Sequence, residues 1–231
     1  MSNLHFIGGE KGGVGKSLVA RVLAQYFIDR ERPFIGFDAD KSHGALLRFY
    51  ADYATPVSID QFDSLDRIVE TAAAQPDVAV LVDLAAQTQQ SLVSWMEESD
   101  LLEMTKELGV QLTYWHVMDT GRDSVDLLRK LLDRFNDKLD LVVVKNEIRG
   151  NDFHQLEQSG ELARAQELGA RVVEIRRLHD ATMQKIDGQS SSFWAAIHPT
   201  NPSASLVGML ERQRVKSWLN KTYAELERAG T

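Results

Sequence analysis

A glycine-rich segment near the start of the chain constrains the fold and the chemistry more than any other feature. It lies between an apolar run, Leu4–Gly8, predicted to be a strand, and a helical pattern, Lys16–Arg30. Glycines allow a turn that aims backbone N–H groups at one point, and the following helix adds further donors. This arrangement is typical of a phosphate-binding loop. The segment is Gly9-Glu10-Lys11-Gly12-Gly13-Val14-Gly15-Lys16-Ser17.

The residues of this loop have separate expected roles. Lys16 would neutralise the β- and γ-phosphates of a nucleotide, and the Ser17 hydroxyl would be a ligand of Mg²⁺. The strict pattern G-x-x-x-x-G-K-[ST] fails at its first glycine, where this chain has Glu10. The alternative is a glycine-rich turn with two incidental lysines. The backbone contacts to phosphate are expected from Gly12, Gly13, Val14, Gly15 and Lys16.

Apolar runs and helical patterns alternate along the chain. Strands are predicted at Leu4–Gly8, Pro33–Phe37, Val78–Leu84, Val110–Met118, Leu139–Val144 and Arg171–Ile175. Helices are predicted at Lys16–Arg30, Ser64–Ala74, Ser91–Leu108, Ser124–Phe135, Phe153–Leu168 and Ser205–Glu227. The alternation predicts an α/β fold with three layers, in which helices cover both faces of a mainly parallel twisted sheet. We expect one domain over residues 1–231, with an irregular segment at Asp187–Ser203.

Acidic residues follow two of the predicted strands. Asp38 and Asp40 share one face after the second strand, and Asp83 follows the apolar run Val78–Val82. The carboxyl ends of parallel strands face the ligand crevice, so Asp38 and Asp83 are candidate contacts to Mg²⁺, and Asp40 could face the attacking water. The alternative for Asp38 and Asp40 is two solvated loop aspartates.

Asn146 ends a later strand, where its amide offers a donor and an acceptor to the edge of a base. The alternative is an asparagine in a turn. The guanine-reading order N-K-x-D is absent, because the local order is Lys145-Asn146-Glu147-Ile148. These residues favour ATP over GTP.

Composition excludes several classes of protein. The chain has 34 acidic and 26 basic residues, a formal charge of −8, so nucleic-acid binding would need a local basic face. It has no cysteine, which excludes disulfides, thiolate zinc sites, iron–sulfur clusters and a cysteine nucleophile. Six histidines form no H-E-x-x-H pattern, so we expect surface or core imidazoles. Without an apolar span or a signal-like start, the expected location is the cytoplasm, with no membrane insertion.

The run Lys11-Gly12-Gly13-Val14-Gly15-Lys16-Ser17 resembles the deviant Walker A loop of the ParA/MinD ATPases. The resemblance implies a P-loop NTPase fold of SIMIBI type and an ATP-dependent homodimer. It also implies that Lys11 reaches the nucleotide of the facing subunit. Asp40 corresponds to the second acid of the family's D-x-D segment, implicated in hydrolysis, and Asn146 to the residue that contacts adenine. The proline usual after that segment is Lys41 here.

Relatives that depend on cysteine are excluded by its absence, including the nitrogenase iron protein and Mrp-like cluster carriers. The remaining group contains positioning ATPases of plasmid partition, flagellar placement and conjugal transfer. The short chain, the early loop and the ending Gln213-Arg214-Val215-Lys216 most resemble the TraL/VirC-type transfer proteins. The resemblance implies slow ATP hydrolysis stimulated by a protein partner.

Two basic clusters are the candidates for a local DNA-binding face. The alternative is a solvated helix surface whose charge is diluted by neighbouring acids. One cluster comprises Arg171, Arg176, Arg177 and Lys185; the other, on the last predicted helix, comprises Arg212, Arg214, Lys216, Lys221 and Arg228.

Two other functions remain open from the sequence. A P-loop metabolic enzyme, such as a dethiobiotin-synthetase-like ligase or a small-molecule kinase, would need a pocket for a second substrate and generally lacks a lysine at position 11. A nucleotide-binding interaction module would keep the loop without significant hydrolysis.

Overall fold

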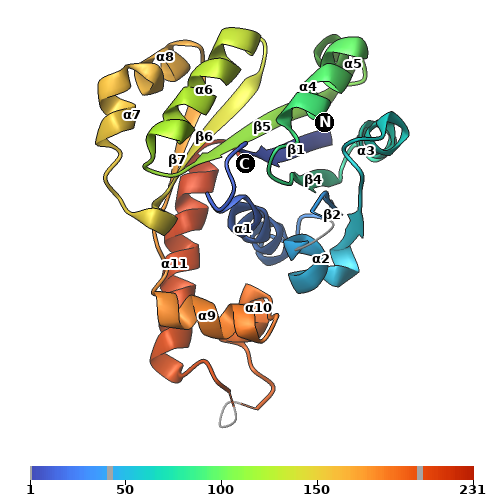
Figure 1. The fold of residues 1–231 in the computed structure, drawn as a ribbon. Helices are drawn as coiled ribbons and strands as arrows, with labels where there is room; N and C mark the ends of the chain where they lie inside the picture. Colours follow the sequence, from blue (N-terminus) through green and yellow to red (C-terminus); the bar gives the residue numbers. More distant parts are fainter. Residues whose placement is uncertain (1, 41–43, 202–204) are drawn as a thin grey trace.

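The strands of the described residues form one parallel sheet of order β3-β2-β4-β1-β5-β6-β7 (Figure 1). The computed structural model describes residues 2–40, 44–201 and 205–231. The predicted α/β class is confirmed. The strands are β1 Ser2–Gly8, β2 Phe34–Asp38, β3 Ala54–Pro56, β4 Ala79–Asp83, β5 Val110–Met118, β6 Asp140–Asn146 and β7 Arg171–Ile175.

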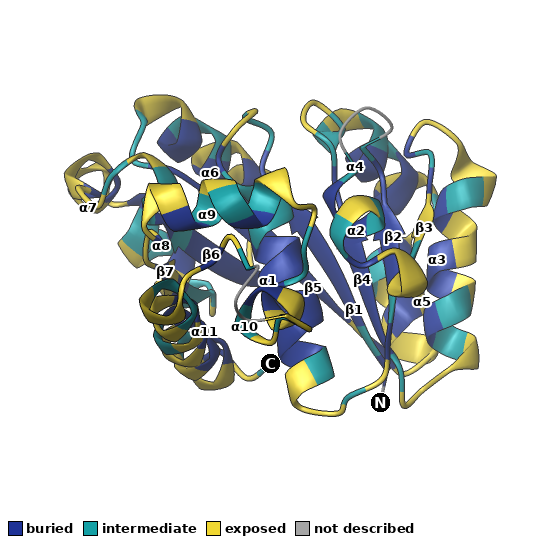
Figure 2. Cartoon of the chain, turned by 90° about the horizontal axis from the view of Figure 1, so that it is seen from below, coloured by how far each residue is buried: buried dark blue, intermediate teal, exposed yellow. Residues whose placement is uncertain are grey.

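Two apolar cores, one on each face, make the structure three-layered. One core joins the sheet to the helices from α3 to α8, and the other joins it to α1, α2, α9, α10 and α11. Figure 2 shows the buried strands between helices whose outer sides are exposed. The helices are α1 Lys16–Asp29, α2 Ala45–Phe49, α3 Phe62–Ala74, α4 Gln89–Glu98, α5 Leu101–Glu107, α6 Arg122–Phe135, α7 His154–Ser159, α8 Glu161–Glu167, α9 Asp180–Gly188, α10 Phe193–Ile197 and α11 Met209–Arg228, with 3₁₀ turns η1 Ala51–Tyr53 and η2 Glu147–Arg149.

Two of the predicted helices are each broken into a pair. The helix expected over Ser91–Leu108 is interrupted by Asp100, whose φ of 45° is left-handed. The helix expected over Phe153–Leu168 is interrupted at Gly160, where φ is 77°. A left-handed residue cannot continue a right-handed helix, so the chain changes direction at each point.

The segment expected to be irregular, Asp187–Ser203, contains the end of α9 and all of α10. Ser192 begins α10 as an N-cap, because its Oγ accepts a hydrogen bond of 3.1 Å from the N–H of Ala195. Residues 202 and 203 lie outside the described residues, as does Lys41. The final helix begins at Met209 rather than Ser205. Across the described ranges, no helix combines the length and apolar character that a membrane crossing requires.

Two of the histidines, His5 and His116, lie in the core of the sheet. Both ring nitrogens of His116 are buried without a hydrogen-bond partner among the described residues. Burial lowers the pKa of His116 to about 4, and the backbone of Ser124 opposes this shift without a full hydrogen bond. Burial lowers the pKa of His5 to about 4 as well. His43 lies outside the described residues.

Replacing His116 with leucine is expected to reduce the acid sensitivity of the fold. The unfolded chain binds a proton at this histidine near pH 6.5, whereas the folded chain binds it only near pH 4. The stability that His116 contributes is therefore complete above about pH 6.5, and on the order of 3 kcal/mol is lost as the pH falls through this window. Urea unfolding between pH 4 and 7.5 should show a shallower loss in the variant. An unchanged pH dependence would contradict the prediction; His5 keeps part of the sensitivity in both proteins.

Candidate nucleotide-binding site

The loop between β1 and α1 is held in a conformation that requires glycine. Gly13 and Gly15 have φ values of 74° and 93°, in the left-handed region. A Cβ atom on Gly15 would lie 2.2 Å from Nδ2 of Asn146. The loop leads directly into α1, whose first N–H groups and positive dipole end add to its own donors. The predicted strand–loop–helix arrangement is therefore present.

Replacing Gly15 with alanine is expected to weaken both the fold and nucleotide binding. The left-handed backbone and the clash with Asn146 together should cost about 1–3 kcal/mol of unfolding free energy. Gly12 provides a matched control, because a Cβ atom there would meet nothing within 4 Å. Urea unfolding and ATP affinity of the two alanine variants check this. If the two variants unfold and bind ATP alike, neither the left-handed backbone of Gly15 nor its contact with Asn146 matters, and the prediction is wrong.

Lys16 is a buried cation at the base of the loop. Its side chain turns back, and Nζ donates a hydrogen bond of 3.1 Å to the carbonyl oxygen of Lys11. Burial lowers the pKa of Lys16, while Asp83, Glu10 and Asp40 act in the opposite direction. A partly desolvated cation beside a cradle of N–H groups is suited to an anionic ligand such as a phosphate chain.

Asp38 and Asp83 end neighbouring strands and are directly paired in the sheet register. Both side chains are buried. Burial, and then the charge of Asp38, raises the pKa of Asp83 to about 7. The Ser17 hydroxyl opposes the shift without meeting hydrogen-bond geometry, since neither oxygen of Asp83 has a hydrogen-bond partner among the described residues. Such a pair of carboxylates is stabilised by a proton or a metal cation between or beside them.

The carboxylate of Asp38 also holds the segment that follows β2. Its two oxygens accept hydrogen bonds from the N–H groups of Asp40, at 3.0 Å, and Leu47, at 3.1 Å. Burial raises the pKa of Asp38 above its ordinary value, and these hydrogen bonds offset the rise only in part. Asp38 thus links the strand end to α2 and positions Asp40. Because the oxygens of Asp38 already accept hydrogen bonds, the oxygens of Asp83 are the more available ligands for a metal.

The residues fit Mg²⁺, although they do not form a preformed cage. Within the described ranges, no group of three or more His, Cys, Asp or Glu residues gathers as a metal site. Mg²⁺ usually keeps several waters and takes one or two protein carboxylates together with phosphate oxygens. Ser17 and the unpartnered oxygens of Asp83 match that donor set, because the Ser17 hydroxyl approaches the carboxylate.

Glu10, the residue that breaks the strict loop pattern, joins the loop to α4. Its Oε2 accepts a hydrogen bond of 3.1 Å from the N–H of Gln89 at the start of α4. The N–H of Gln87 donates to the Glu10 carbonyl at 3.4 Å. The carboxylate is therefore used at a helix N-terminus, where a negative charge is favourable. This contact connects the phosphate loop to the segment after Asp83.

Asn146 lies under the loop. Its Nδ2 donates a hydrogen bond of 2.9 Å to the carbonyl of Val14, and the residue is buried. Beside it is a cavity of about 110 Å³, whose lining combines apolar residues with the charged Arg21, Arg177, Asp180 and Asp187; the apolar ones include Leu18, Leu178 and Met183. The apolar part of this lining and the amide of Asn146 suit the face and edge of a base. The adenine contact expected for Asn146 remains a prediction.

Two further residues, which are not among the predicted site residues, lie beside the loop. Asp119 follows β5 and forms ion pairs with Lys11, at 3.2 Å, and Arg149, also at 3.2 Å. Asp119 could have been found, since it ends an apolar strand just as Asp38 and Asp83 do. Arg149, in η2, carries no comparable signal. Lys11 therefore contacts a carboxylate of its own chain.

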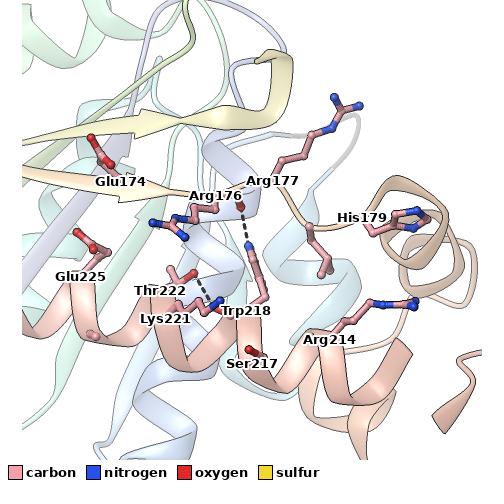
Figure 3. A pocket seen from close by; sticks show the side chains of 12 residues that line it. Glu174, Arg176, Arg177, His179, Arg214, Ser217, Trp218, Lys221, Thr222 and Glu225 are labelled. Carbon is pink, nitrogen blue, oxygen red and sulfur yellow. Dashed lines mark hydrogen bonds between the residues drawn. The ribbon is translucent and has the colours of Figure 1, made fainter. Parts of the chain in front are cut away.

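The basic residues gather differently from the prediction. A groove of about 550 Å³ between the end of β7 and α11 is lined by Arg176, Arg177, Arg214 and Lys221 (Figure 3). Among the described residues only Arg177 of these four makes an ion pair, with Asp180. By contrast, two residues of the first predicted cluster lie outside this groove and form ion pairs there: Arg171 with Asp140, and Lys185 with Glu211. The groove also contains Glu174 and Glu225.

The curated proteins that are similar in sequence include MobD and TraL proteins. MobD of Acidithiobacillus ferrooxidans is 29% identical over 148 residues, which cover 62% of this chain and 63% of MobD. The match thus spans less than two thirds of that relative. A TraL protein of Escherichia coli is 24% identical over 244 residues and 99% of both chains. No protein-family model matches the chain.

Three solved structures share the fold. MinD, a cell division protein of Aquifex aeolicus, superposes with a TM-score of 0.55 at 13% identity, over 97% of this chain and 98% of MinD. A plasmid partition protein of Borrelia burgdorferi bound to AMPPNP gives 0.52 at 13%, over 96% and 99%. A nucleotide-binding protein of Archaeoglobus fulgidus in complex with ADP gives 0.52 at 16%, over 81% and 86%. At identities this low, the structural likeness shows a common fold and nothing more.

Proposed function

We propose that residues 1–231 of this chain, which is similar to the ParA/MinD ATPases and their conjugal-transfer branch, form one Mg²⁺-dependent ATPase domain. The observation that carries the proposal is the placement of buried Lys16 in a glycine loop beside the paired Asp38 and Asp83. The nucleotides in two structural relatives support ATP as the ligand. The similarity to MobD, TraL and a plasmid partition protein supports a role in plasmid partition or conjugal transfer, exercised in the cytoplasm.

The proposed mechanism depends on positioning and electrostatics. The loop N–H groups and Lys16 bind the phosphates, while Asn146 and the cavity beside it receive the base. Ser17 and Asp83 would hold Mg²⁺, which neutralises phosphate charge when bound. Asp38 fixes the segment that carries Asp40, and Asp40 orients the attacking water. With no covalent intermediate, slow hydrolysis is expected until a partner completes the geometry.

Dimerisation is the second part of the proposal. Lys11 lies at the rim of the loop with its side chain 23% exposed, so it can exchange its own chain's Asp119 for the phosphates of a facing subunit. The resemblance to ParA/MinD ATPases supports this exchange. Two subunits would then close face to face, each supplying Lys11 to the other, and hydrolysis would release them.

DNA is the proposed ligand of the basic groove. Arg176, Arg214 and Lys221 line it without ion-pair partners among the described residues. Because the chain as a whole is acidic, binding would be confined to this face and would weaken steeply with salt. Arg214→Ala/Lys221→Ala should lose DNA binding and keep ATP affinity.

ATPase turnover with and without DNA tests the function against its rivals. A switch ATPase should turn over slowly and respond to DNA or to a protein partner, with turnover lost in Asp40→Ala. A metabolic ligase or kinase would consume ATP only with a second small substrate. A nucleotide-binding module would bind ATP without turnover under any of these conditions, and that result would refute the enzymatic part of the proposal.

A further inference from the structure

Arg149 reaches the phosphate loop from a separate part of the chain. It ends η2, directly after β6, and its side chain is half-exposed. Nη2 donates to the carbonyl of Gly12 at 3.4 Å, and Nη1 lies 3.2 Å from Oδ2 of Asp119. The guanidinium therefore spans the loop and the end of β5, although no loop motif predicts a cation from this position.

Gly13 shows how closely the guanidinium lies against the loop. A Cβ atom on Gly13 would come within 2.5 Å of Nη2 of Arg149, whereas one on Gly12 would meet nothing within 4 Å. The absence of a side chain at Gly13 therefore leaves the space that the Arg149 guanidinium occupies. The cation lies over the part of the loop whose backbone N–H groups are expected to bind phosphate.

Asp119 holds the Arg149 guanidinium in place. Its buried carboxylate accepts hydrogen bonds from Oγ of Ser124, at 2.6 Å, and from the N–H of Gly121, at 3.1 Å. Burial raises the pKa of Asp119, but the bonds from Ser124, Gly121 and Lys11 outweigh burial and hold it below its ordinary value. Asp119 is therefore a fixed negative charge at the edge of the loop.

Two cations share that single buried carboxylate. Lys11 lies 3.2 Å from Asp119, and its other ion pair, with Asp123 at 3.9 Å, is to a side chain that is 81% exposed. Arg149 has Asp119 as its only ion-pair partner among the described residues. Water screens the exposed and more distant Asp123, so Asp119 supplies most of the negative charge near both cations, and an anionic ligand would add to it.

We propose that Arg149 is a phosphate-binding residue of the nucleotide site, supplied by the same chain that supplies the loop, with Asp119 as its positioning residue. The inference rests on the proposed ATP site. A guanidinium presents a planar fork of donors, and its contacts with Gly12 and Asp119 use only part of that fork. The remaining N–H groups can bind phosphate oxygens in the bidentate geometry that arginine favours. When Lys11 engages a facing subunit, Arg149 remains as the cation held by Asp119.

Nucleotide affinities of the full chain test the proposal. ATP, ADP and AMP are measured by displacement of a fluorescent nucleotide from wild type, Arg149→Ala, Arg149→Lys and Arg122→Ala. Arg122 is the matched control: it begins α6 near Asp119, and its side chain is 86% exposed. Arg149→Ala should weaken ATP and ADP by about tenfold or more, with AMP changed less than twofold. Arg149→Lys should recover part of the loss, and Arg122→Ala should match wild type.

Several results would overturn the proposal. Unchanged ADP affinity in Arg149→Ala would remove Arg149 from the phosphate site. An equal loss for AMP would place its effect on the base cavity, through the neighbouring Asn146 and Ile148. Melting temperatures of all variants identify a folding defect. If Arg149→Ala does not fold, Arg149→Lys is used to compare the affinities for ATP, ADP and AMP. If wild type and Lys16→Ala both fail to bind ATP, the proposed function fails as well, which is distinguishable from a defect confined to Arg149.

Discussion

Replacing Lys16 with alanine is expected to abolish ATP binding. Lys16 is the buried cation of the loop, and its Nζ already lies 3.1 Å from the Lys11 carbonyl, within the turn that would enclose the phosphates. Removing it deletes both a positive charge and a charge-assisted hydrogen bond in a partly desolvated place. Isothermal titration should show ATP affinity reduced by roughly 100-fold or more.

The control for this variant is Lys130→Ala. Lys130 is exposed on α6, away from the loop, so its removal changes the net charge by the same amount. Its ATP affinity should remain within twofold of wild type, and both variants should melt near the wild-type temperature. If Lys16→Ala binds ATP as tightly as Lys130→Ala does, the loop is not the nucleotide site.

The sequence predicts the loop and the strand ends well because both are local patterns. Each strand apart from β3 overlaps a predicted apolar segment, so the parallel sheet and the positions of Asp38 and Asp83 at strand ends follow from the sequence pattern. The pairing of these two residues is a consequence of β2 and β4 being neighbours in register. The pattern places them at one end of the sheet, and the fold then brings them side by side.

The remaining parts of the site depend on contacts between distant segments. Asp119 and Arg149 are 30 positions apart and meet only because β5 and β6 are neighbours. No short-range signal marks Arg149, since exposed arginines are common near strand ends. The break at Asp100 has a local signal that the apolar pattern on both sides obscures, because Ser99 and Asp100 are favoured where helices begin and aspartate tolerates a left-handed backbone. The bond from Asn146 to Val14 likewise requires the loop to fold over β6.

ATP is expected to drive dimerisation of the Asp40→Ala protein, and Lys11 is expected to be required for it. Loss of Asp40 should impair hydrolysis, so the ATP-bound form accumulates. Lys11 must then leave Asp119 of its own chain, where its Nζ lies at 3.2 Å, and bind phosphate across the interface. The exchange replaces one charge-assisted contact with another, so phosphate binding compensates for the loss of Asp119.

Light scattering at saturating ATP measures the effect. Asp40→Ala should have twice the monomer mass with ATP and the monomer mass with ADP, because only the longer phosphate chain completes both sites. Asp40→Ala/Lys11→Ala should remain monomeric while it still binds ATP, whereas the matched Asp40→Ala/Lys130→Ala should dimerise. A monomeric Asp40→Ala protein at saturating ATP would contradict the dimeric switch. If Asp40→Ala/Lys11→Ala still dimerises with ATP, the dimeric switch stands but the cross-subunit role of Lys11 is refuted. The role of Lys11 would then be its ion pair with Asp119.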